Sequence, residues 1–147
     1  MIFSDQRLSG NVMNGMKPSV LCLLASLGTS VQAARPAEIQ LNMTQLTGKQ
    51  CNGELESSST IIPGDCITYR LEVKNIGEIA ARYVEVTALI PEHTELHSTF
   101  RRIATQEMLG SVIEQKPNGQ RVIKTTLDAL HANDNAPVVL EYSVKVL

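Results

Sequence analysis

The stretch from Pro63 to Pro91 constrains the fold of this chain most, because it has the pattern of two β-strands joined by a short turn. In its first half, apolar residues alternate with polar ones, which is the period of a strand with one buried face and one solvent-facing face. The apolar residues of this half are Ile67, Tyr69, Leu71 and Val73. After the turn at 75–77, the second strand carries Val84, Val86, Ala88 and Ile90 on one side. Pro91 ends it, since proline has no backbone N–H to donate. The stretch therefore predicts two antiparallel strands of a β-sandwich.

Further strands are expected on both sides of this pair. Before it, the apolar residues Ile39, Leu41 and Met43 alternate with the polar residues Glu38, Gln40 and Asn42. After it, residues 112–127 predict a hairpin that turns through Lys116-Pro117-Asn118-Gly119, where proline and glycine suit a tight turn. Residues 94–103 fit either a strand or irregular chain, and residues 105–109 fit one helical turn.

The last strand of the chain is expected to alternate as well. Its inward residues are Val138, Leu140, Tyr142, Val144 and Val146, and its outward residues are Glu141, Ser143 and Lys145. About seven short strands separated by turns, without a long helical period, predict an all-β fold. We expect an immunoglobulin-like antiparallel β-sandwich.

The first 33 residues have the pattern of a signal peptide. Lys17 supplies positive charge, residues 20–27 supply an apolar stretch, and Val31-Gln32-Ala33 places small residues before the expected cleavage after Ala33. Residues before Met16 include Asp5 and Arg7 and make a poor start for a signal peptide, so Met13 and Met16 are the candidate true initiators. The apolar stretch is shorter than the roughly 20 residues of a membrane span. These features predict an exported protein, periplasmic or at the cell surface, with no stable membrane span; the alternative is a buried helix of a cytosolic protein.

Cysteine usage agrees with export. Cys22 lies within the apolar stretch of the signal peptide, so Cys51 and Cys66 are the two cysteines of the mature chain. In an oxidising compartment they are expected to form a disulfide that closes a polar, flexible loop. A loop of about 15 residues gives a stabilisation of roughly 3 kcal/mol. The alternative is two separate buried thiols. We assign residues 34–61 to a first strand and the disulfide loop, and residues 62–147 to the immunoglobulin-like domain.

Three segments carry a family resemblance. They are PGDCITYRLEVKNIG at 63–77, YVEVTALIP at 83–91, and the turn with a valine-rich strand at 130–147. Together they resemble the domain of unknown function 11 family over residues 62–147. The resemblance implies an extracytoplasmic immunoglobulin-like module of bacterial surface proteins, with no catalytic residues. The chain has room for one copy, whereas the family often occurs in tandem, and it lacks the acidic residue that the family usually has shortly before Pro91.

Candidate catalytic and metal-binding residues are few. A zinc-protease motif needs glutamate directly after the first histidine on a helix, which the segment from His93 to His97 lacks. On a strand, residues four apart lie about 13 Å from each other, too far to share one ion. Ser57-Ser58-Ser59 has no neighbouring histidine, and Asp134 between two asparagines is typical of a turn. The sequence therefore predicts no catalytic residue, no metal site and no cofactor.

Charge and composition bear on the partner. The net charge is −2 and aromatic residues make up 3% of the chain, which disfavours nucleic-acid binding. We predict a non-catalytic structural or interaction module of the bacterial cell envelope whose partner is an envelope or surface protein. Edge strands at 36–44 or at the C-terminus are the candidate binding elements. Two alternatives stay open: a chaperone or assembly factor acting through an edge strand, and a periplasmic metal carrier using His93, His97 or Met108.

Overall fold

A computed structural model describes residues 31–57, 60–133 and 136–147. The fold is carried by one compact unit, Ala33–Leu147. The proposed signal peptide falls almost entirely on residues 1–30 and so lies outside the described residues, as do Ser58, Ser59 and Asp134. No helix in the described part of the chain is long and apolar enough to cross a membrane.

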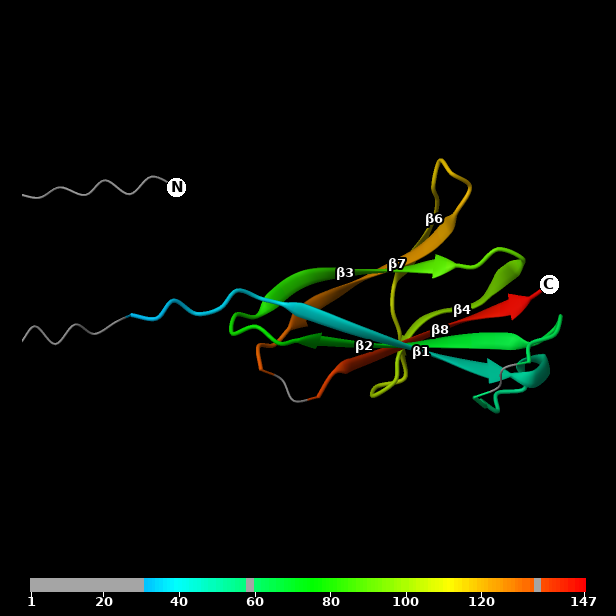
Figure 1. The fold of residues 1–147 in the computed structure, drawn as a ribbon, viewed down its shortest axis with the longest axis horizontal. Coiled ribbons are helices and arrows are strands. Elements are labelled where there is room, and N and C mark those ends of the chain that lie inside the picture. The colour runs from blue at the N-terminus through cyan, green and yellow to red at the C-terminus, as the bar shows by residue number, and fades with distance from the viewer. Residues whose placement is uncertain (1–30, 58–59, 134–135) are drawn as a thin grey trace, which may run out of the picture. The chain divides into compact units, whose positions relative to one another are not determined.

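Two antiparallel β-sheets make up this unit, which confirms the predicted all-β sandwich (Figure 1). The strands are β1 (Ile39–Gly48), β2 (Cys66–Asn75), β3 (Ala81–Ile90), β4 (Thr94–Arg102), β5 (Glu107–Met108), β6 (Ser111–Gln115), β7 (Arg121–Leu130) and β8 (Val138–Val146). A 3₁₀ turn, η1 (Lys49–Cys51), follows β1. One sheet has the order β1-β2-β8-β4-β5 and the other has the order β3-β7-β6. The described chain thus has eight strands, one more than the seven expected.

The core lies between the two sheets and follows the predicted alternation. The predicted apolar residues of β2 are buried, and on β3 Val86, Ala88 and Ile90 are buried while Val84 is partly buried. Tyr142 on β8 packs at the centre, with its ring 5.0 Å from that of Tyr69 and 5.2 Å from that of Phe100. Its hydroxyl donates a 2.9 Å hydrogen bond to the carbonyl of Leu89 on β3. This bond ties the five-stranded sheet to the three-stranded one.

One local prediction was wrong and one uncertainty is resolved. Residues 94–102 form the strand β4, which pairs with β8 with register shifts between Leu96 and Ser98 and between Ser98 and Arg101. Residues 105–109 form no helical turn: the chain reverses at 103–106, and β5 pairs back with Arg101 and Arg102. The hairpin of β4 and β5 satisfies backbone groups that a single helical turn would leave open.

The terminal strand was expected to have one solvent-facing side and was one of two candidates for an edge strand. Instead, β8 is the central strand, between β2 and β4. Glu141 and Ser143, predicted to face outward into solvent, are only 5% and 7% exposed. They do lie on the outer face of the sheet, but side chains from both neighbouring strands cover that face.

Candidate functional site

A groove of about 250 Å³ lies on the outer face of the five-stranded sheet. Its walls come from the end of β1, the loop after it, and strands β2, β4, β5 and β8. The residues that line it are Gly48, Cys51, Gly53, Leu55, Cys66, Thr68, His97, Ser98, Arg101, Met108, Glu141 and Ser143. Strand order assembles this set, because β8 brings β2 and β4 to either side of itself although they are about 30 residues apart in the chain.

A charged cluster centred on Glu141 lies at the groove, which Glu141 and Arg101 help to line. One carboxylate oxygen, Oε1, accepts hydrogen bonds from Arg70 Nε at 2.7 Å and pairs with Arg70 Nη2 at 2.6 Å. The other oxygen, Oε2, lies 3.4 Å from Arg101 Nη2. The Glu141 side chain is 6% exposed, whereas both arginines are 40% or more exposed. A buried carboxylate is stable here because two charged donors replace its hydration.

The two serine hydroxyls beside this cluster form a hydrogen bond with each other. Ser98 Oγ and Ser143 Oγ are 2.6 Å apart across β4 and β8. Within the described part of the chain, no hydrogen bond joins the His97 ring to either serine or to Glu141. A nucleophile needs a base within hydrogen-bond reach that is itself oriented by a third group. The groove, as described, does not provide that arrangement.

A disulfide between Cys51 and Cys66 closes one end of the groove, with the two Cα atoms 4.8 Å apart. Cys66 begins β2 and is buried, whereas Cys51 ends η1 and is partly exposed. Gln50 and Cys51 both have positive φ, at 51° and 55°, a backbone conformation that non-glycine residues adopt at a cost. Asp65 supports this bend, because its Oδ1 accepts a 3.1 Å hydrogen bond from the Gln50 N–H.

The loop between the cysteines is more ordered than its composition predicted. Thr47 and Glu56 exchange two backbone hydrogen bonds, each 2.8 Å long. Asp65 Oδ2 accepts a further bond, 3.1 Å long, from the N–H of Ile62. The part of the loop that the structure describes is therefore folded back against β1 and against the start of β2.

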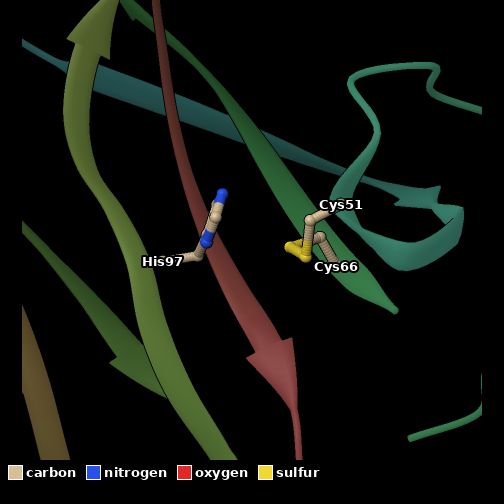
Figure 2. A group of neighbouring side chains, drawn as sticks. All are labelled: Cys51, Cys66 and His97. Atoms are coloured by element: carbon tan, nitrogen blue, oxygen red, sulfur yellow. A yellow bond between two sulfur atoms is a disulfide. The ribbon is translucent and has the colours of Figure 1, made fainter. Parts of the chain in front are cut away.

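His97 lies beside this disulfide, as Figure 2 shows. One ring nitrogen of His97 and the two sulfurs of Cys51 and Cys66 all lie within 4.8 Å of one another. His93 lies outside the groove lining, in the turn that precedes β4. Met108, on β5, contributes an exposed thioether to the same groove. The sequence drew attention to the two histidines but gave no sign of the cysteine neighbours, because 31 residues separate Cys66 from His97.

The other notable surface is the free edge of β1. The backbone N–H and C=O of Thr47 bond to Glu56, so they point away from β2. The backbone C=O of Glu38 instead accepts a hydrogen bond from the N–H of Ile76, so it points toward the β2 side. Backbone groups alternate sides along a strand, so the odd-numbered residues point outward. Among the described residues, no strand pairs with this outer edge from Ile39 to Gln45.

The odd-numbered residues of β1 also carry an exposed apolar row. Ile39, Leu41 and Met43 pair with Asn75, Val73 and Leu71, so their side chains lie on the core-facing side of the sheet. They are nevertheless 40%, 49% and 59% exposed. Strand β1 contains no charged residue along its ten positions. Exposed edges usually carry charges or proline that prevent strand addition, and this edge carries neither.

Comparisons with protein-family models, with curated proteins and with solved structures found no match to this chain.

Proposed function

We propose that this protein is a non-catalytic interaction module of the bacterial cell envelope that binds its partner through the edge of β1. The observation that carries this proposal is the outward-pointing backbone of Ile39–Gln45 next to an exposed apolar row. Added strands gain affinity from backbone hydrogen bonds and specificity from alternate side chains. The edge of β1 offers both.

The chemistry of the partner follows from that of the edge. A partner strand that pairs with β1 places alternate side chains on the core-facing side, next to Leu41 and Met43. Apolar residues at those alternate positions would bury surface that is now in contact with water, at about 25 cal/mol per Å². The bridge from Thr47 to Glu56 occupies the far end of the edge, which limits the added strand to about seven residues of β1. We infer an extended, alternately apolar segment of an envelope or surface protein.

The proposed location of the protein in the cell envelope is supported by features other than the edge of β1. The leader pattern of residues 1–33, the Cys51–Cys66 disulfide and the resemblance to the domain of unknown function 11 family all favour an extracytoplasmic location. A chaperone or assembly factor would use the same edge of β1, and the identity of the bound partner separates the two roles.

Proline substitutions can test this edge only at outward-pointing positions. Ser143 is unsuitable, because it lies in the central strand β8 and proline there removes a bond of the sheet itself. Gln40 is even-numbered, and its backbone points toward β2, so proline at Gln40 also damages the fold. Proline at Met43 removes an outward N–H and leaves the pairing with β2 intact.

A photo-reactive amino acid at Met43, introduced in cells, tests the proposal. The matched control is Val112, which is 61% exposed on β6, an edge strand of the other sheet. We expect a discrete adduct with an envelope protein from position 43, which the paired changes Leu41→Lys and Gln45→Pro at neighbouring outward β1 positions weaken. Adducts that form from position 112 and not from β1 would refute the assignment of the binding surface.

A further inference from the structure

We propose that Cys51, Cys66 and His97 form a redox-switched site for a soft d¹⁰ metal ion such as Zn²⁺ or Cu⁺, closed in the disulfide form and open after reduction. This site is separate from the edge of β1, so a test of the metal site neither supports nor contradicts the proposed function. It also differs from a carrier built on His93 and His97, since it needs only one of these histidines.

The geometry supports this proposal first. Tetrahedral Zn²⁺ with bonds of about 2.3 Å to sulfur and 2.0–2.1 Å to nitrogen holds its ligand atoms roughly 3.5–3.8 Å apart. The three candidate ligand atoms already lie within 4.8 Å of one another. Movements of about 1 to 2 Å therefore suffice, most of them to separate the two sulfurs once the bond between them is broken.

The protein has a fixed and a movable half for such an adjustment. Cys66 begins β2, and His97 lies in β4 at a register shift between Leu96 and Ser98; both strands are paired with β8, on either side of it. Cys51 lies instead at the end of η1, in a backbone bend with positive φ that the disulfide ties to β2. Reduction releases this tie, so Cys51 is the ligand that can move to the ion.

The donor set selects the class of ion. Two thiolates and one imidazole suit Zn²⁺ and Cu⁺, whereas Ca²⁺ and Mg²⁺ need oxygen ligands. Three protein ligands leave a fourth position open toward the groove, where water or the nearby thioether of Met108 completes the coordination. The Arg70–Glu141–Arg101 cluster is already paired and does not compete for the ion.

The redox step balances through thiol–disulfide exchange. A dithiol reductant attacks one sulfur of the protein disulfide, its second thiol resolves the mixed disulfide, and two protein thiols and the oxidised reductant result. The metal ion then replaces the two thiol protons and forms two metal–sulfur bonds. In reverse, a disulfide oxidant takes up two electrons, the Cys51–Cys66 bond re-forms and the ion leaves.

The test uses the full chain carrying Cys22→Ser, so that only the two cysteines of the site contribute thiols. Zn²⁺ and Cu⁺ binding is measured by competition with a chromophoric chelator, before and after reduction with a phosphine. We expect no stoichiometric binding in the oxidised chain and one equivalent per reduced chain. Co²⁺ as a spectroscopic substitute should give thiolate-to-metal charge-transfer absorption.

His97→Ala keeps the disulfide and removes an exposed side chain, so it should fold and, once reduced, bind the ion at least about tenfold more weakly. His131→Ala is the matched control, an exposed histidine outside the groove lining, and should bind as the parent does. Circular dichroism of each reduced chain with and without the ion monitors the fold. The proposal is overturned if neither ion binds the reduced chain, if His97→Ala binds as tightly as the parent, or if the reduced chain unfolds and the ion does not restore it.

Discussion

The substitution Glu141→Gln tests whether the buried carboxylate of Glu141, paired with Arg70 and Arg101, stabilises the fold. The substitution keeps the volume of the side chain and removes its charge. Hydrogen bonds to a charged group contribute about 1.5–3 kcal/mol, and neutral ones about 0.5–1.5 kcal/mol. Arg70 makes the two short contacts, at 2.6 Å and 2.7 Å, and can still donate to the amide oxygen. The new amide N–H₂ group, however, faces the Arg101 donor.

We therefore expect a loss of about 1–2 kcal/mol in the free energy of unfolding. This is less than the 3–5 kcal/mol typical of breaking a fully buried ion pair. The reason is that both arginines are 40% or more exposed and regain water. With a urea dependence of about 2 kcal/mol per M, in the middle of the usual range, the unfolding midpoint should fall by roughly 0.5–1 M.

Glu114→Gln is the matched control for this measurement. Its carboxylate lies 2.9 Å from Lys124 Nζ on the other sheet, but the Glu114 side chain is 47% exposed. Exposed pairs of this kind contribute less than about 1 kcal/mol. Urea unfolding followed by circular dichroism gives both midpoints. If Glu141→Gln shifts the midpoint no further than Glu114→Gln does, Glu141 does not have the buried environment described here.

Three further predictions concern the stability of the sandwich. Burial raises the pKa of Tyr142 and of Tyr69 above the usual 10.0. The unfolded chain therefore ionises first, so stability should be complete below about pH 10 and fall as the pH rises above it; urea midpoints that stay constant through this range would contradict the assignment. Gly77→Ala places a Cβ 2.8 Å from the Cα of Ala37 and should cost about 1–3 kcal/mol, whereas Gly110→Ala meets open space and should cost under about 0.5 kcal/mol in the same assay. Reduction of the disulfide should lower the free energy of unfolding by about 3 kcal/mol, and equal midpoints with and without reductant would exclude that contribution.

The sequence predicted those parts of the fold that depend on local periodicity. The alternation of Ile67 to Val73 and the turn near Gly119 both follow from residue order alone, and the structure confirms both. The order of strands in a sheet depends instead on contacts between distant residues. For this reason the sequence allowed β8 to be an edge strand and predicted that Glu141 faces solvent, although β8 lies between β2 and β4.

The candidate sites show the same division. The Cys51–Cys66 pair was predictable, because these two cysteines lie after the expected leader and flank one loop. The proximity of His97 to that pair was not, since it needs β4 to lie two strands from β2. The exposure of Leu41 could not be predicted from the sequence either. Its alternation with polar residues indicates a buried face, but the three-stranded sheet leaves that part of β1 uncovered.

The proposed binding mode makes one residue-specific claim, namely that the partner pairs with the outward backbone groups of β1. Hydrogen exchange of individual amides tests this claim directly when it is measured by NMR with and without the partner that crosslinking identifies. The amides of Leu41 and Met43 point away from β2 and should exchange quickly in the free protein and slowly in the complex. The amides of Gln40 and Asn42 bond to β2 and should change little. If the partner binds and the amides of Leu41 and Met43 exchange as fast as they do in the free protein, strand addition at β1 is excluded.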